Sequence, residues 1–217
     1  ERRPDSRGKV RDIYDAGENL LMVATDRISA FDFILPDEIP FKGEVLNRIS
    51  AFWFDKFADI VPNHLVSIDP ADFPEEFAEY RDYLAGRAML VKKAQTIPIE
   101  CIVRGYLTGS GKKTYDENGT VCGIQLPEVD RLQESQQLPE PIYTPSTKAE
   151  IGDHDENISL ERCCEIVGED IAAQIRDLSL KIYKAAAEYA ATRGIIIADT
   201  KFEFGLDEDG NVVLGDE

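Results

Sequence analysis

Short apolar segments separated by turn-forming residues dominate the first part of the chain. Residues 9–14 and 20–24 are rich in β-branched and aliphatic side chains, and the turn formers of 16–19 lie between them. This pattern predicts a β-hairpin. Similar apolar segments at 88–92 and 97–103 predict two further strands.

Two longer segments repeat their apolar residues with the period of an α-helix. In 44–60 this pattern predicts a helix that faces the core, and Pro62 lies just beyond its end. The apolar positions are Val45, Ile49, Phe52, Trp53, Phe57 and Ile60. In 160–193 the pattern is stronger, and we expect two helices that are separated near Gly168 and stopped by Gly194. The positions that share a face there are Ile171, Ile175, Leu178, Ile182 and Ala186.

The remaining segments complete an α+β pattern. Residues 195–198 are a continuous apolar run, which is typical of a buried strand. Residues 125–141 are mostly polar, and we expect a surface loop. The strand-rich beginning and the mixed remainder predict two lobes, 1–95 and 96–217.

The charge of the chain limits its partners. A formal net charge of -18 argues against a general affinity for nucleic acid or for anionic membranes. A phosphate ligand must therefore meet a local cluster of basic groups. Because no apolar run approaches the roughly 20 residues that span a bilayer and the first residues are polar, we expect a cytoplasmic protein. The four cysteines lack metal-site spacing, so we expect packed, reduced thiols.

The last twenty residues predict a hairpin with a polar face. Alternation places Asp199, Lys201 and Glu203 on one side of a strand and Phe202 and Phe204 on the other.

A tight turn in this hairpin would bring two acids together. Asp209-Gly210 favours a two-residue turn. The pairs would then be Glu208 with Asn211, Leu206 with Val213, and Glu203 with Asp216. Carboxylates whose Cβ atoms are about 4.5–5.5 Å apart repel each other, so either one is protonated or a divalent cation, Mg²⁺ by preference, binds between them. The alternative is a longer loop with a shifted register, which leaves both acids solvated.

A basic segment near the N-terminus is a candidate polyphosphate site. If 9–14 is a strand, Lys9 and Arg11 share one side of it just after Gly8. Backbone amides and two positive charges would hold a polyphosphate. The alternative is an ordinary charged strand edge. Lys92 would add a further contact.

A glycine-rich segment, 98–111, is a candidate monophosphate site. A strand that ends at Arg104 is expected to lead into a turn with three glycines, in which Thr108 and Ser110 supply hydroxyl groups. A buried Glu100–Arg104 ion pair is the alternative. The polar segments 143–150 and 152–157 are expected to lie in loops that line a site.

Taken together, these segments resemble the phosphoribosylaminoimidazole-succinocarboxamide synthase family along almost the whole chain. The segments that carry the resemblance are 8–14, 26–32, 98–110, 152–159 and 199–205. It implies a smaller β-rich lobe, related to that of protein kinases, and a larger α+β lobe, with ATP and the active site in the cleft between them. The family normally continues beyond the position of Glu217 into a substrate-binding loop with Pro-Asp and arginine.

The resemblance also implies roles for individual residues. ATP would contact Gly8, Lys9, Arg11 and Lys92, and Mg²⁺ would bind Glu203 and Asp216. The imidazole ribonucleotide would contact Asp32, Arg104, Thr108, Gly109 and Ser110. Lys201 and Asp199 would lie where the chemical transfer occurs.

The implied activity is an ATP-dependent carbon–nitrogen ligation in purine biosynthesis. The carboxylate of an imidazole ribonucleotide would be activated as an acyl phosphate, and aspartate would attack it to form an amide. A small-molecule kinase with the same ATP and Mg²⁺ site is an alternative, as is an inactive nucleotide-binding protein. The sequence does not indicate the oligomeric state.

Overall fold

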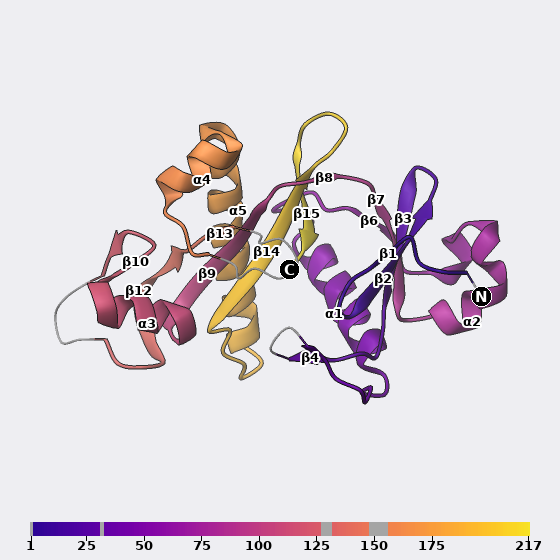
Figure 1. Ribbon diagram of the computed structural model, residues 1–217, viewed down its shortest axis with the longest axis horizontal. Helices are drawn as coiled ribbons and strands as arrows, with labels where there is room; N and C mark the ends of the chain where they lie inside the picture. Colours follow the sequence, from indigo (N-terminus) through magenta and orange to yellow (C-terminus); the bar gives the residue numbers. More distant parts are fainter. Residues whose placement is uncertain (1, 31–32, 127–131, 148–155) are drawn as a thin grey trace. The chain divides into compact units, whose positions relative to one another are not determined.

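The computed structural model describes residues 2–30, 33–126, 132–147 and 156–217. The chain divides into two compact units, Glu1–Ala94 and Gln95–Glu217, each with its own sheet (Figure 1). Both contain helices as well as strands, so the predicted α+β class is confirmed. Which substrate each unit binds stays a prediction.

The first unit is built on an antiparallel five-stranded sheet in the order β1–β2–β3–β7–β6. These strands are β1 (Ser6–Arg7), β2 (Arg11–Ala16), β3 (Asn19–Ala24), β6 (Leu65–Ser67) and β7 (Ala88–Lys92). β2 and β3 form the predicted hairpin, in which Ala16 pairs with Asn19. Gly17 turns the chain between them with a φ of 75°, a conformation that favours glycine. A separate short pair consists of β4 (Ser29–Ala30) and β5 (Phe33–Ile34).

Helical segments lie on both sides of this sheet (Figure 1). They are α1 (Lys42–Lys56) on one side, and η1 (Pro70–Asp72), η2 (Glu75–Tyr80) and α2 (Arg81–Leu84) on the other. Phe77 and Leu84 from the second group pack with Leu21 and Val23 of β3 in a buried core.

The face of α1 that is buried is not the predicted one. Val45 and Ile49 are 57% and 51% exposed. The buried positions are Gly43, Asn47, Ser50 and Phe54. A Cβ at Gly43 would lie 2.2 Å from the carbonyl oxygen of Ala24, so the helix packs directly on the backbone at the end of β3. Asn47 donates to two backbone carbonyls at 3.0 and 3.2 Å, which satisfies its buried amide.

Asp26 attaches the start of α1 to the end of β3. Its carboxylate accepts hydrogen bonds from the backbone of Gly43 at 2.9 Å and of Phe41 at 3.3 Å. It also pairs with Arg87 at 3.2 Å. The bond from Gly43 is the main reason that the pKa of Asp26 is lowered, and it outweighs the effect of burial.

The second unit contains a larger sheet in which β12, β9, β14 and β15 follow one another. Its strands are β8 (Gln95–Thr96), β9 (Ile99–Leu107), β12 (Gln136–Tyr143), β13 (Ser146–Thr147), β14 (Asp199–Leu206) and β15 (Val212–Asp216). β13 also pairs with β9, and β8 pairs with β14. The helix α3 (Gly109–Asn118) precedes a small hairpin of β10 (Thr120–Val121) and β11 (Ile124–Gln125).

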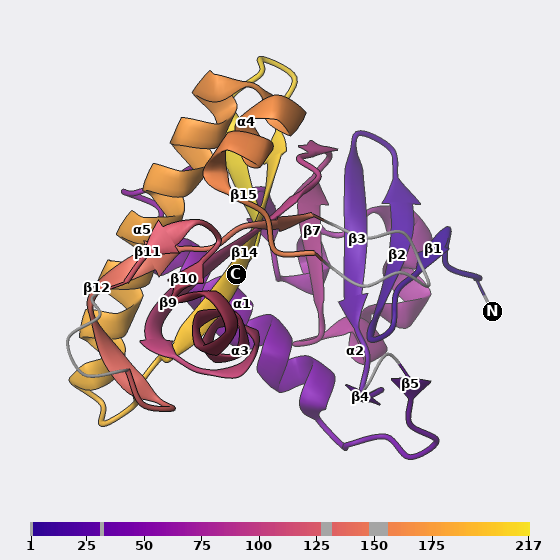
Figure 2. The same cartoon turned by 60° about the vertical axis from the view of Figure 1, so that its left-hand side comes forward.

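Two helices follow, as predicted. α4 (Leu160–Val167) and α5 (Glu169–Ala191) are separated by Gly168, whose φ is 86°. α5 runs along one face of the larger sheet, and Figure 2 shows it beside β12. Ile175, Ile182 and Ala186 are buried there, as the helical pattern predicted.

Two strand predictions and one loop prediction for this unit need correction. β9 continues through Arg104 to Leu107, because the charge of Arg104 is neutralised within the sheet rather than exposed at its end. β12 occupies the last part of the segment that was expected to be a loop, from Gln136 onward. Residues 195–198 are not a strand, and Ile196 is 71% exposed; only the carbonyl of Ala198 accepts bonds from the β9 backbone.

Candidate active site

A turn at residues 8–11 precedes β2 and is held by the residues that follow β3. The amide of Gly8 donates to the carbonyl of Arg11 at 2.8 Å and closes the turn. Thr25 donates to the carbonyl of Val10 twice, from its amide at 2.9 Å and from its hydroxyl at 2.8 Å. The carbonyls of this turn are therefore directed toward the segment after β3.

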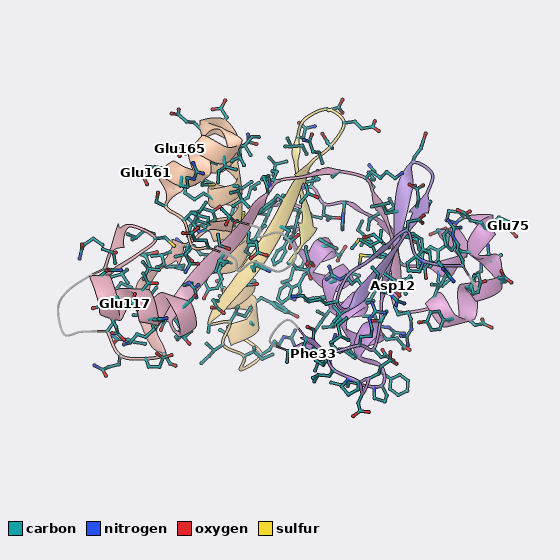
Figure 3. All side chains as sticks on the ribbon, in the orientation of Figure 1. Asp12, Phe33, Glu75, Glu117, Glu161 and Glu165 are labelled. Atoms are coloured by element: carbon teal, nitrogen blue, oxygen red, sulfur yellow. The ribbon has the colours of Figure 1, made fainter. Side chains whose placement is uncertain are left out.

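Arg27 fixes the same turn through a second set of bonds. Its guanidinium donates to the carbonyls of Gly8 and Lys9 at 3.2 and 3.1 Å, and to both carboxylate oxygens of Asp12 at 2.7 and 3.2 Å (Figure 3 labels Asp12). Burial raises the pKa of Asp12, but Arg27 and Arg7 outweigh it and hold that pKa below its ordinary value. An ionised Asp12 thus anchors Arg27.

This arrangement orients the amides of the turn. In a planar trans peptide, the N–H points away from the carbonyl of the preceding residue. Because the carbonyls of Gly8 and Lys9 face Arg27, the amides of Lys9 and Val10 face the opposite side. Successive amides that point the same way form a concavity that can bind an anion.

The basic residues around the turn differ from the prediction in two respects. Lys9 lies in the turn and Arg11 begins β2, so the expected alternation along one strand is wrong. Lys42, at the start of α1, was missed by sequence reasoning. Burial lowers the pKa of Lys42, and the nearby charge of Arg11 lowers it further. Two cations held close together are typical of a site for an anion.

Lys92 lies at the other end of the sheet. It pairs with Asn19 at the beginning of β3, whereas Arg11 pairs with Ala24 at its end. At about 3.4 Å per residue, these ends are separated by about 17 Å. The backbone therefore does not bring Lys92 beside Lys9 and Arg11.

Polar side chains gather on one face of the second unit's sheet. β9 contributes Glu100 and Arg104, and β14 contributes Asp199 and Lys201. Asp199 is directly opposite Arg104. Phe202 and Phe204 are buried on the other face, as predicted.

Arg104 is at the centre of a hydrogen-bond network although it is only 4% exposed. Its Nε donates to the hydroxyl of Thr144 at 3.0 Å, and Nη2 donates to the hydroxyl of Ser110 at 3.0 Å. Nη1 pairs with Asp199 at 3.2 Å. Gly111 packs against the guanidinium, since a Cβ there would lie 3.1 Å from Cδ of Arg104.

The glycine-rich segment after Arg104 begins a helix rather than forming the predicted turn. Thr108 precedes α3, Gly109 is its first residue, and Ser110 follows. The first amides of a helix have no intrahelical acceptor, and the helix dipole favours an anion there. The predicted monophosphate residues therefore lie together, at a helix N-terminus beside a buried arginine.

Glu100 has a different partner from the one considered in the alternative prediction. Its Oε1 accepts from the ammonium of Lys201 at 2.7 Å, and its Oε2 accepts from the hydroxyl of Ser146 at 3.3 Å. Arg104 pairs with Asp199 instead. Two neighbouring cations are thus each matched by a carboxylate.

The C-terminal hairpin pairs the two predicted acids, but its loop and its register differ from the prediction. Leu206 pairs with Val212, so residues 207–211 form a loop longer than the expected two-residue turn, and the register there is shifted by one. A bulge between Glu203 and Phe204 shifts the register back. Glu203 is consequently the Cα partner of Asp216, as predicted.

Glu203 and Asp216 supply some, but not all, of the oxygen ligands that a hard cation needs. Two carboxylates on adjacent strands match the one or two that Mg²⁺ usually takes from a protein, with phosphate oxygens and water completing the shell. Over the described ranges, no cluster of three or more His, Cys, Asp or Glu side chains is arranged to hold a metal ion. A cation here would therefore depend on ligands that the substrates bring.

Two further predictions concern Asp32 and the cysteines. Asp32, expected to contact the ribonucleotide, lies outside the residues that the structure describes. Behind the polar face, the Tyr143 hydroxyl donates to Sγ of Cys101 at 3.4 Å, and burial raises the pKa of Cys101 to about 12. Since all four cysteines are free, this is a packed thiol, as expected.

One sheet face carries paired positive and negative groups, and a helix N-terminus lies beside Arg104. The first unit contributes a basic turn. These features suit an enzyme that acts on phosphorylated, anionic substrates. Comparison with known proteins gives the family, because a family model described as SAICAR synthetase matches residues 5–217. The chain belongs to the SAICAR synthetase family.

The chain is similar to several phosphoribosylaminoimidazole-succinocarboxamide synthases. It is 62% identical to that of Syntrophotalea carbinolica over 212 residues, which cover 98% of this chain and 71% of the relative. It is 59% identical to that of Lachnospira eligens over 217 residues, with coverage of 97% and 72%.

Solved structures show the same likeness. The SAICAR synthase of Saccharomyces cerevisiae complexed with SAICAR has a TM-score of 0.88 and 48% identity, and the match covers 98% of this chain and 72% of that one. A SAICAR synthetase in complex with ADP has a TM-score of 0.77 and 26% identity, with coverage of 98% and 79%. Within the described residues, no helix is both long and apolar enough to cross a membrane.

Proposed function

We propose that this chain is an ATP-dependent ligase of de novo purine biosynthesis. It joins the amine of aspartate to the carboxylate of a carboxylated aminoimidazole ribonucleotide, and it releases the succinocarboxamide SAICAR, ADP and phosphate. The shared name of the relatives and the SAICAR and ADP in the solved structures support this reaction. In the structure, the supporting observation is that two ion pairs, Arg104–Asp199 and Lys201–Glu100, lie on one sheet face.

The first step activates the carboxylate. A carboxylate oxygen of the ribonucleotide attacks the γ-phosphorus of ATP, the bond to ADP breaks, and an acyl phosphate forms. Both reactants are anions, so positive groups must offset their repulsion. We assign Gly8, Lys9 and Arg11 to the triphosphate, together with the outward-facing turn amides. Lys201, which remains 46% exposed while Glu100 holds it, is assigned to the transfer region.

The second step forms the amide. The aspartate amine attacks the acyl carbon, the carbon–oxygen bond to phosphate breaks, and the proton that the amine loses passes to solvent. Asp199 is assigned to this region, where its half-exposed carboxylate can accept a hydrogen bond from the amine. Correct alignment of the two anionic substrates supplies much of the remaining rate.

The other assignments hold the substrates and a cation. The monophosphate of the ribonucleotide is assigned to Arg104, Thr108, Gly109 and Ser110, and Asp32 to the same substrate. Glu203 and Asp216 would hold Mg²⁺, which would neutralise phosphate charge. A cytoplasmic location, the absence of nucleic-acid partners and a contact between Lys92 and ATP stay predictions.

The test is ADP release by the protein with ATP, Mg²⁺ and the ribonucleotide, measured with and without aspartate. We expect ADP release that depends on aspartate, together with one SAICAR for each ADP. Aspartate-independent release with a stable phosphorylated product would instead indicate a kinase, and nucleotide binding without turnover would indicate an inactive binding protein.

A further inference from the structure

The segment after β12 continues along β9 through Pro145. Ile142 is the partner of Arg104, and Ser146 is the partner of Glu100, which is the same antiparallel register on both sides of the proline. The amide of Thr144 donates to a β9 carbonyl at 2.8 Å between these pairs. Directly opposed residues share a face of the sheet, so Thr144 and Ser146 lie on the polar face.

Both hydroxyl side chains are buried, and each contacts a charged group of the site. Thr144 is 0% and Ser146 is 1% exposed. The Thr144 hydroxyl accepts from Nε of Arg104 at 3.0 Å, and the Ser146 hydroxyl donates to Oε2 of Glu100 at 3.3 Å.

These contacts restrict the two cations in different ways. A guanidinium is planar, so a fixed Nε–H together with the packing of Gly111 sets the directions of both terminal nitrogens of Arg104. Those nitrogens then reach Asp199 and Ser110. For Glu100, the bond at Oε2 directs Oε1 toward Lys201.

We propose that Thr144 and Ser146 are positioning residues for amide formation: Thr144 orients Arg104 toward the ribonucleotide's phosphate, and Ser146 orients the Glu100 carboxylate that holds Lys201. This inference rests on the proposed function. It assigns a role to the short segment 144–146, which supplies two buried hydroxyls. Pro145 between them has no backbone N–H that would need an acceptor.

Steady-state kinetics of three variants test the role of Thr144. Thr144→Val keeps the shape but removes the hydroxyl, Thr144→Ser keeps the hydroxyl, and Thr147→Val is the control on the opposite face of the same segment. We expect Thr144→Val to raise the KM for the ribonucleotide about tenfold, which corresponds to about 1.4 kcal/mol. The KM for ATP should not change, and Thr144→Ser and Thr147→Val should stay within about twofold of the wild type.

Ser146→Ala should act on the transfer step instead. We expect it to lower kcat about tenfold, with little change in the KM for the ribonucleotide. Equal ribonucleotide KM values for Thr144→Val and the wild type would overturn the role of Thr144. The role of Thr144 would also be overturned if Thr144→Val and Thr144→Ser lost the same thermal stability and the same affinity for both substrates. An unchanged kcat in Ser146→Ala would overturn the role of Ser146.

A measurement without substrate separates this inference from the proposed function. Solvent exchange of the Arg104 Nε–H can be followed by ¹⁵N NMR, with Arg104→Lys used to assign the signal. We expect slow exchange in the wild type and Thr144→Ser, and faster exchange in Thr144→Val. Equal exchange in all three would refute the orientation of Arg104. A wild type without aspartate-dependent ADP release would refute the proposed function and leave that orientation in place.

Discussion

Replacing Arg27 with lysine is expected to loosen the turn at 8–11 while it keeps the positive charge. The guanidinium makes two bonds to Asp12, at 2.7 and 3.2 Å, and three to backbone carbonyls of the turn, at 3.2, 3.1 and 3.5 Å. A lysine ammonium carries its three donors on one atom and cannot span both sets. The variant must therefore lose either the turn or most of the contact with Asp12.

The size of the effect follows from these bonds. A hydrogen bond to a charged group contributes about 1.5–3 kcal/mol. The side chains of Arg27 and Asp12 are 15% and 11% exposed, so solvent screens the pair only slightly. Because lysine retains part of the interaction, we expect the free energy of unfolding to fall by about 2–3 kcal/mol. The KM for ATP should rise as the turn amides lose their orientation.

Urea unfolding can measure this loss with a fluorescence signal that comes from the first unit. Trp53, the single tryptophan of the chain, lies on α1 of that unit and provides the fluorescence signal. Arg81→Lys is the matched control, because the Arg81–Glu75 pair is 3.4 Å long with side chains 39% and 89% exposed. It should change the free energy of unfolding by less than about 0.5 kcal/mol.

The pH dependence gives a second check. The folded-state pKa of Asp12 is lowered from 3.8, so the pair stabilises the fold fully above that pH and is lost as the pH falls through the folded-state pKa. The difference between the wild type and Arg27→Lys should therefore shrink in acid. Equal stabilities at neutral pH, or a difference that does not decrease in acid, would refute the reasoning.

Three other substitutions test the packing and the acidic pair. Gly43→Ala should lower the free energy of unfolding by about 2–3 kcal/mol in urea, since the new Cβ would lie 2.2 Å from a carbonyl oxygen of β3; a loss below about 1 kcal/mol would contradict the close packing. Gly111→Ala should raise the KM for the ribonucleotide but not for ATP, because its Cβ would press on Arg104 at 3.1 Å; unchanged ribonucleotide kinetics would contradict this. Glu203→Gln and Asp216→Asn should each abolish turnover and leave stability unchanged or higher, since a like-charge repulsion is removed. Normal activity and magnesium dependence in both would count against the metal assignment.

The C-terminal hairpin shows how local reasoning can reach a correct pairing through a wrong turn. Asp209-Gly210 favours a two-residue turn, but the carboxylate of Asp207 accepts bonds from the amides of Asp209 and Asn211 and stabilises a longer loop. The longer loop shifts the register of the hairpin by one residue, and the bulge beside Glu203 shifts it back. Neither the side-chain bonds of the loop nor the bulge can be read from alternation.

The helix α1 shows the limit of periodicity. Its helical period was predicted correctly, as was the burial of Phe57 just after it. The side of the helix that is exposed was predicted wrongly. The buried side is set by the close approach of Gly43 to β3 and by the bonds of Asn47, and both involve backbone that is distant in sequence. In contrast, the break at Gly168 depends on one residue's own conformational preference and was predictable.

Candidate chemistry was predictable where residues are close in sequence. Alternation placed Asp199 and Lys201 on one strand face, and the family resemblance then implied their role. Thr144 was noted only as part of a polar segment, because its contact with Arg104 joins residues 40 positions apart. Lys42 gave no signal in the sequence, since only the fold brings it near Arg11.

The most direct test of the proposed chemistry is an isotope transfer. The ribonucleotide is labelled with ¹⁸O in its carboxylate and converted with ATP and aspartate, and the released phosphate is analysed by mass spectrometry. Activation as an acyl phosphate predicts that each phosphate carries one oxygen from the carboxylate. Phosphate without the label, formed at the same rate as SAICAR, would contradict the mechanism.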